Sequence, residues 1–212
     1  MVADNPDLAD FFVQASGSSI TQAFLSAAAL ILALALAGYA ISGVLRLSGE
    51  ESNGRVEVLL ATPTPRDRWV ASHLVVTLVG SVVAAAAGGF AVGVGAAAST
   101  GDGSLLIEMV WALLVFVPAV GVLAGAAFAL WAWWPRLGML AWVGLVWAAL
   151  AGLLAEVLDL PAWALDLSPL QHVPALPAAR FEALPLVVMG AVTGVLVLLG
   201  VVGFRRRDLS TT

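Results

Sequence analysis

Few side chains in this sequence could carry acid–base or metal chemistry. The chain has 212 residues, with two histidines and no cysteine. Glu108 and Glu156 stand near the ends of long apolar stretches, and His172 stands in a later proline-rich stretch. Because an ionisable group in a membrane segment is by default a functional candidate, we name Glu108, Glu156 and His172 as candidates for a substrate pathway or an outer gate. Alternatively, both acids lie shallow enough to reach lipid headgroups.

The residue patterns of common enzymes and cofactor sites are absent from the sequence. His172 has no second histidine nearby and no acid at ligand spacing. No HExxH, GxSxG, dinucleotide glycine fingerprint or GxxxxGK(S/T) phosphate loop occurs. We therefore expect no catalytic, cofactor-binding or metal-binding residue on this chain. An intramembrane enzyme is a weak rival interpretation, because no constellation of His, Asp and Glu falls on one membrane face.

The elements that carry these residues are long apolar blocks. Hydrophobic residues make up 61% of the chain and charged residues 11%, with a mean hydropathy of +1.02. Soluble domains are about 45–50% apolar and about 25% charged, so we predict an integral membrane protein. A membrane-spanning helix needs about 20 apolar residues, and the blocks show no sustained alternation of the kind that barrel strands have. We predict an all-α membrane domain with five spans, at about 22–45, 69–98, 105–134, 137–158 and 185–204.

The arginines predict the orientation of these spans. All nine basic residues are arginines, and eight of them fall on one side of the predicted membrane. An excess of arginine marks the cytoplasmic side. We therefore place the N-terminus outside, the C-terminus in the cytoplasm and the protein in the plasma membrane. The eight are Arg46, Arg55, Arg66, Arg68, Arg136, Arg205, Arg206 and Arg207, whereas Arg180 falls on the outer side.

Several residues predict how the helices pack. Small residues four apart let membrane helices approach closely, and the chain has three such glycine pairs: Gly89/Gly93, Gly121/Gly125 and Gly190/Gly194. We expect these pairs to pack helices within the chain, and a dimer interface is the alternative. Pro118 lacks the N–H that would bond the carbonyl of Leu114, so it should kink the third span. Tryptophans at the cytoplasmic ends of spans two and three are expected to act as interfacial anchors; they are Trp69, Trp131, Trp133 and Trp134.

The polar segment 46–68 between spans one and two is patterned as a short amphipathic helix. Ser48, followed three residues later by Glu51, matches a helix-opening capping box. Val56, Leu59 and Leu60 form one apolar stripe. The alternative is a helix that lies on the membrane surface. Such helices usually have a basic polar face, whereas this one carries three acids against one arginine.

The sequence on either side of this helix contains prolines that define the neighbouring elements. Thr62-Pro63 should end the amphipathic helix, and Thr64-Pro65 should start the helix that becomes span two. Segment 159–184, before the last span, contains four more prolines. It is too broken to span a bilayer and too apolar for a free loop. We expect short helices there that lie at the outer leaflet or re-enter it.

These motifs resemble type-2 ABC exporter permeases, in particular the exporters of polyketide-type antibiotics. The family run E-E-x-x-G-R-x-E-x-L-L-A-T-x-x-x-R matches EESNGRVEVLLATPTPR at 50–66, and LSPLQHVPALPA at 167–178 and FRRRDL at 204–209 match later family segments. The resemblance implies that 46–68 contains a coupling helix that docks on an ATPase. Together with the apolar stripe, the matched positions give the expected coupling residues: Glu50, Glu51, Gly54, Arg55, Val56, Glu57, Leu59, Leu60, Ala61, Thr62 and Arg66.

The resemblance also implies a mechanism and a set of partners. ATP and magnesium would be bound by a separate ATPase, present in two copies, and this chain would rock against a second permease half within the lipid bilayer. A small hydrophobic drug or antibiotic would leave the cytoplasm between the halves. The family half-permease has six spans and this chain has five, with the shortfall before span one. We expect no nucleic-acid partner. The rival interpretation is a non-transport membrane protein, such as an assembly or immunity factor.

Overall fold

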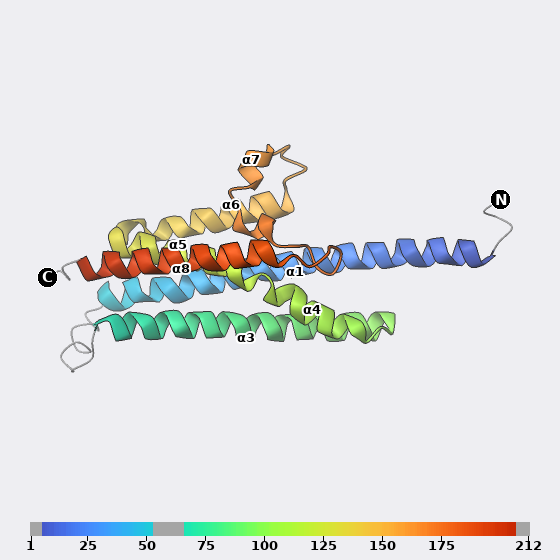
Figure 1. Cartoon of the computed structure of the whole chain (residues 1–212), viewed down its shortest axis with the longest axis horizontal. Coiled ribbons are helices and arrows are strands. Elements are labelled where there is room, and N and C mark those ends of the chain that lie inside the picture. The colour runs from blue at the N-terminus through green and yellow to red at the C-terminus, as the bar shows by residue number, and fades with distance from the viewer. Residues whose placement is uncertain (1–5, 53–65, 207–212) are drawn as a thin grey trace.

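The computed structural model describes residues 6–52 and 66–206 (Figure 1). Every regular element in these two ranges is an α-helix or a 3-10 helix. Five helical stretches are long and apolar enough to cross a membrane. They confirm the prediction of an all-α membrane fold with five long helices, and they run over Ile20–Gly49, Arg68–Thr100, Ser104–Trp133, Pro135–Leu153 and Ala183–Arg206.

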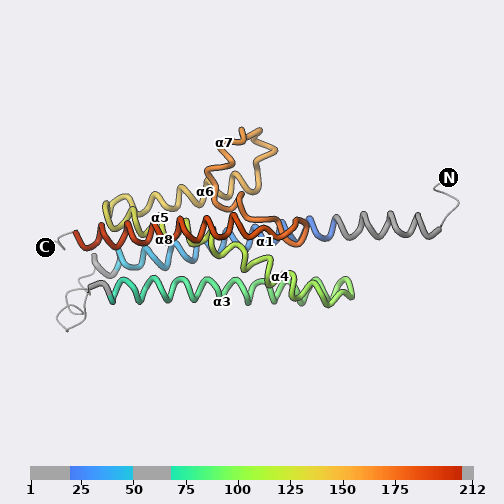
Figure 2. Tube along the Cα trace, viewed as in Figure 1, coloured from blue at the N-terminus to red at the C-terminus, as the bar shows by residue number. Residues whose placement is uncertain are grey.

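The helices run roughly parallel or antiparallel to one another, so the bundle has two ends (Figures 1 and 2). Helix α1 (Pro6–Ser52) ends, α3 (Arg66–Thr100) begins and α8 (Ala183–Arg206) ends at the same end of the bundle. The turn after α5 (Val117–Trp133) also lies there. We call this the arginine end, because these elements carry Arg46, Arg68, Arg136, Arg205 and Arg206.

Helix α1 is the central helix of the bundle. It packs against α3, α4 (Ser104–Leu114), α5 and α6 (Ala141–Leu153). Its buried residues follow the three- and four-residue spacing that places side chains on one helix face, and many of them are alanines, which let the neighbouring helices come close. These buried residues are Leu25, Ala29, Ala33, Leu36, Ala37, Ala40, Ile41, Val44 and Leu47.

Helices α3 and α4 form a tight antiparallel pair. The turn between them contains Gly101 at a φ of +77°, a backbone conformation that favours glycine. A Cβ on Gly89 would lie 2.5 Å from the carbonyl oxygen of Met109, and one on Gly93 would lie 2.7 Å from Cα of Leu106. Only glycine allows this approach of the two backbones. The predicted packing role of this glycine pair is confirmed.

The third apolar stretch is broken into two helices. Helix α4 ends at Leu114 and α5 begins at Val117, with Val115 and Phe116 between them. The break lies one turn before Pro118, whose missing N–H cannot bond the carbonyl of Leu114. The predicted kink at Pro118 is therefore confirmed. Its consequence is a change of neighbour, because α4 packs on α3 whereas α5 packs chiefly on α8.

Helices α5 and α8 pack against each other along most of their length. A Cβ on Gly121 would lie 3.0 Å from Oγ1 of Thr193, and one on Gly125 would lie 3.1 Å from Cβ of Leu196. The Thr193 hydroxyl donates within its own helix to the carbonyl of Met189 at 2.9 Å and lies 3.3 Å from the carbonyl oxygen of Pro118. The second glycine pair thus also packs inside the chain, as expected.

The fourth apolar stretch differs from its expected bounds. A 3-10 helix, η1 (Pro135–Leu140), precedes α6, and α6 ends at Leu153, whereas the sequence prediction extended this span to Leu158. Residues 154–158 are apolar apart from Glu156 but form a bend and turns, and the region closes with Asp159 at a positive φ of 47°. Two short helices, α7 (Ala162–Leu165) and η2 (Pro169–His172), follow before α8.

Candidate functional site

Three of the predicted coupling residues belong to helix termini at the arginine end. Glu50 and Glu51 belong to the last turn of α1, and Arg66 is the first residue of α3. The segment therefore connects two helices that each contact α5. The remaining expected coupling residues lie outside the described residues, so the amphipathic helix stays a prediction; they are Gly54, Arg55, Val56, Glu57, Leu59, Leu60, Ala61 and Thr62. The predicted start of a helix at the Ser48 capping box is wrong, because α1 continues without a break to Ser52.

An aromatic cluster joins α3, α5 and α8 next to this segment. The ring of Trp69 lies 6.3 Å from that of Phe204 and makes an edge contact with His73 at 5.4 Å. Phe204 stacks on Trp131 at 5.6 Å, and Trp131 lies 6.1 Å from Phe128. We call these five residues the aromatic cluster. Aromatic pairs at such distances contribute about 0.5–1.5 kcal/mol beyond simple burial, so they tie three helix ends together.

This cluster corrects one prediction from the sequence. Trp131 was expected to be an interfacial anchor, but its side chain is fully buried against Phe128 and Phe204. Trp133 and Trp134 remain 40% and 58% exposed, as an anchoring role requires. The indole N–H of Trp133 also donates to the carbonyl of Leu199 on α8 at 3.0 Å. Sequence position alone could not separate these tryptophans, because the packing of α8 decides which of them is covered.

The three candidate pathway residues are exposed and belong to separate elements. Glu108 lies on α4, Glu156 in the turns after α6 and His172 at the end of η2. No group of three His, Asp or Glu within 6–52 and 66–206 could hold a metal ion. Nδ1 of His172 lies 3.1 Å from the carbonyl oxygen of Ser168. The structure therefore does not gather these residues into one site, and their role in a pathway stays a prediction.

Glu108 belongs to a small polar group near the turn between α3 and α4. The hydroxyl of Ser104 donates to Oδ1 of Asp102 at 2.8 Å and lies 3.3 Å from Oε1 of Glu108. The backbone N–H of Ser104 also donates to Oδ1 of Asp102 at 3.0 Å. The side-chain and backbone hydrogen bonds from Ser104 lower the pKa of the Asp102 carboxyl. These polar side chains therefore satisfy one another around the turn and the start of α4, which explains the local polarity.

The segment between α6 and α8 folds back against the bundle. Leu170 and Val173 are buried in the common core. The side-chain amide of Gln171 donates to the carbonyl of Ala151, and the indole of Trp147 donates to that of Ala164 at 3.2 Å. Ser26 on α1 donates to the carbonyl of Ala175 at 3.1 Å. Short helices are thus present where they were expected. Their re-entry into a membrane stays a prediction.

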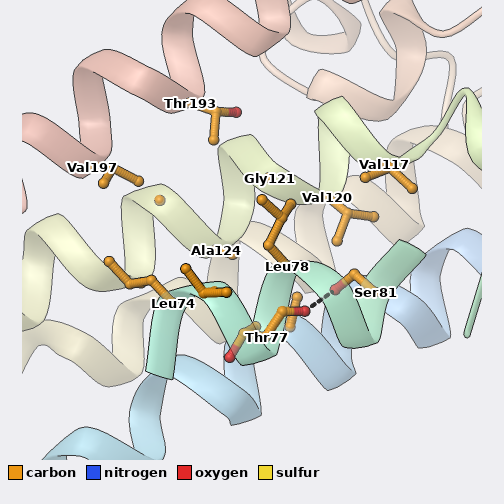
Figure 3. A pocket seen from close by; sticks show the side chains of 13 residues that line it. Leu74, Thr77, Leu78, Ser81, Val117, Val120, Gly121, Ala124, Thr193 and Val197 are labelled. Carbon is orange, nitrogen blue, oxygen red and sulfur yellow. Dashed lines mark hydrogen bonds between the residues drawn. The ribbon is translucent and has the colours of Figure 1, made fainter. Parts of the chain in front are cut away.

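The described helices also form an apolar cavity between α3 and α8 (Figure 3). It has a volume of about 180 Å³ and is lined by residues of α1, α3, α5 and α8, none of them charged. Its polar residues are Thr77, Ser81 and Thr193. The hydroxyl of Ser81 donates back to the carbonyl of Thr77 at 2.8 Å, as Figure 3 shows, and that of Thr193 is bonded within α8.

None of the pathway residues predicted from the sequence lines this cavity. The one sequence signal that could have pointed to it is the placement of hydroxyl side chains in the middle of apolar helices. Thr77 and Ser81 stand one turn apart in the second apolar stretch, and Thr193 stands in the last one. Such residues also occur where helices merely pack, so the signal does not identify a cavity by itself.

Comparison with known proteins places the chain in a family. Residues 1–205 match the family model described as "Multidrug efflux system permease Rv1217c, C-terminal domain". The chain is also 35% identical over 210 residues to the "Multidrug efflux system permease protein Rv1217c" of Mycobacterium tuberculosis (strain ATCC 25618 / H37Rv). This alignment covers 98% of the chain but only 38% of the relative. The chain therefore belongs to the family of the C-terminal domain of the multidrug efflux system permease Rv1217c.

Proposed function

We propose that this chain is a membrane-spanning part of an ATP-driven exporter that moves small hydrophobic compounds out of the cytoplasm. The observation that carries the proposal is the family match over residues 1–205, to the C-terminal domain of a multidrug efflux permease. The five long apolar helices suit a permease. The chain has no phosphate-loop motif, so we assign ATP and magnesium to a separate ATPase.

The ATPase would dock on the coupling segment 46–68. Its resemblance to the exporter coupling run supports this placement, as does its position between α1 and α3 at the arginine end. Movement of the segment would reach α5 and α8 through the aromatic cluster, whose Trp69 lies three residues after Arg66. The permease would work with a second membrane half and two ATPase copies. It would reside in the plasma membrane, with its C-terminus in the cytoplasm.

The test is an efflux assay in a host that lacks its own drug pumps. The chain is co-expressed with the rest of its permease and with a candidate ABC ATPase from the same organism, and cells are loaded with a fluorescent hydrophobic dye. We expect faster dye loss than in cells that lack the chain. The matched control replaces the phosphate-loop lysine of the ATPase, which contacts the nucleotide phosphates, and should abolish the gain.

Two outcomes would contradict the proposal. Dye loss that is equal with and without the chain would show that the chain takes no part in efflux of this compound class. Dye loss that survives the ATPase substitution would show that ATP hydrolysis on that partner does not drive it. A panel of dyes of different charge guards against choosing a compound that the exporter does not carry.

A further inference from the structure

One face of α3 packs against α4 in the second half of the helix and is exposed in the first half. Gly89 and Gly93 lie against the backbone of α4. Val75, Leu78 and Val82 continue the same stripe toward the arginine end, at the three-, four- and seven-residue spacings that keep side chains on one helix face. These three side chains are 58%, 52% and 41% exposed. The stripe is therefore a helix-packing face that this chain fills only in part.

The break between α4 and α5 causes this difference. Beyond the break α5 packs chiefly on α8 and contacts α3 little, so a groove opens with α3 and α8 as its walls and α5 as its floor (Figure 3). Leu74 lies across it from Thr193 and Val197 (Figure 3), and Val75 also lines it. A neighbouring cavity of about 340 Å³ shares Leu74, Val75 and Val197 with the first, so the groove continues toward the arginine end.

The α8 wall carries the third glycine pair. Gly190 and Gly194 share a helix face with Val197, which lines the groove, by their spacings of four and three residues. A Cβ added at Gly190 or Gly194 would meet no atom within 4 Å. The other two glycine pairs each lie against a neighbouring helix of this chain. This third pair is the exception, and it extends the groove with a surface suited to close helix approach.

We propose that the groove between α3 and α8 is the docking site for a transmembrane helix supplied by the part of the permease that this chain does not span. The chain covers only 38% of its relative, so the relative contains further chain that could provide it. On α3 the lining runs from Val70 to Ser81, which is three helical turns, or about 16 Å. The lining carries no charge, so the occupant is apolar.

The burial of α3 and α8 leaves surface for a further neighbour. Half of the most apolar window of Ser104–Trp133 is buried, against 22% for α3, 22% for Pro135–Leu153 and 17% for α8. Because Pro135–Leu153 does not line the groove, the lining residues and not the low burial locate the docking site. The floor of the groove contains Ala124, and a small residue of this kind lets a helix backbone come close. The docked helix would cover the exposed half of the α3 stripe, as α4 covers the other half. This inference concerns assembly and does not depend on the transport activity proposed above.

The test uses site-specific photo-crosslinking in membranes that contain the complete permease. A photoreactive residue is placed at Val75 or Val197, which line the groove. The matched controls are Val83 and Val195, which are exposed and lie on other faces of the same two helices. We expect cross-links from Val75 and Val197 to a peptide related to the part of the relative that this chain does not span. The two control positions should give none.

Three outcomes would overturn the proposal. Adducts with lipid alone at all four positions would show a lipid-filled groove. Cross-links from Val75 and Val197 to a second copy of this chain would show a homodimer face. Equal cross-linking at the control positions would show no preference for the groove.

A second measurement tests the same contact by blocking it. Gly194→Leu places a side chain in open space, so the chain's own fold should be retained. It should abolish the cross-link from Val197, whereas Val195→Leu should leave it unchanged. Retention of the cross-link in Gly194→Leu would contradict the proposed position of the helix.

Discussion

Gly93 and Gly190 are chemically identical residues in similar apolar helices, and the fold makes opposite demands on them. A Cβ on Gly93 would lie 2.7 Å from Cα and 2.9 Å from the carbonyl oxygen of Leu106, whereas one on Gly190 would meet nothing within 4 Å. Backbone atoms of a packed helix cannot rotate aside as a side chain can. The same substitution should therefore have opposite effects at the two positions.

We expect Gly93→Ala to destabilise the fold and Gly190→Ala to leave it unchanged or slightly stabilised. Overpacking of a well-packed core costs about 1–3 kcal/mol, while replacing glycine within a helix by alanine returns about 0.5–1 kcal/mol. The gain from replacing glycine by alanine is common to both variants. The difference between their stabilities therefore measures the cost of the clash with α4. Thermal unfolding of the purified protein in detergent measures it. An unfolding temperature for Gly93→Ala equal to that of Gly190→Ala would show that α3 and α4 are not in backbone contact.

At the coupling segment, we expect the apolar stripe to matter more for docking than any single charge. Burying one leucine contributes about 1.5–3 kcal/mol, whereas an exposed ion pair gives about 0–1 kcal/mol. Leu59→Ala combined with Leu60→Ala should therefore reduce ATPase recovery in pull-downs, with membrane insertion unchanged. Glu57→Gln serves as the milder control. If the double variant retains the ATPase and exports as the parent does, the segment is a surface helix and not a coupling element.

At the scale of elements, the aromatic cluster should couple α3 to α5 and α8. We expect Trp69→Ala to slow dye efflux while ATPase recovery stays near the parent level, because the contact with Phe204 is lost and the docking stripe is intact. Truncating a fully buried aromatic side chain lowers folding stability by about 3–5 kcal/mol. Trp69 is only partly buried, so Trp69→Ala should lower it by less. Efflux and pull-down assays on the same membranes separate the two effects.

Trp163→Ala provides the matched control for this prediction. Trp163 is 70% exposed and lies on α7, on the other side of α6 from the cluster (Figure 1). Trp163→Ala removes the same kind of side chain but leaves α3, α5 and α8 unchanged. Equal losses of efflux in Trp69→Ala and Trp163→Ala would assign the effect to a general loss of tryptophan surface and not to transmission through the cluster.

The elements also show what could be predicted from the sequence. The break before α5 was predictable because a proline lacks an N–H wherever it stands. The end of α6 at Leu153 was not, because residues 154–158 remain largely apolar while the backbone already turns. Hydropathy reports solvent preference and not helical geometry. The burial of Trp131 escaped prediction for a related reason, since it depends on where α8 crosses α5.

For the whole molecule, the arginines divide the bundle into two ends. The elements that carry Arg46, Arg68, Arg136 and Arg206 share one end in the structure. Arg180 precedes α8, and α8 begins away from the arginine end, where it terminates. The fold thus groups the charges as the positive-inside rule requires, although the structure contains no membrane. The rule assigns the arginine end to the cytoplasm, and labelling in intact cells can test that assignment.

The chain has no cysteine, so single cysteines can be introduced without removing any. We expect cysteines at Ser52 and Ser210, on the side that the arginines predict to be cytoplasmic, to resist a membrane-impermeant thiol reagent in intact cells. Cysteines at Ser18 and Asp102 should react, because both positions fall on the predicted outer side. Permeabilised cells provide the control, in which all four positions should label. Labelling at Ser52 in intact cells, with Asp102 protected, would reverse the orientation and place the coupling segment where no cytoplasmic ATPase could reach it.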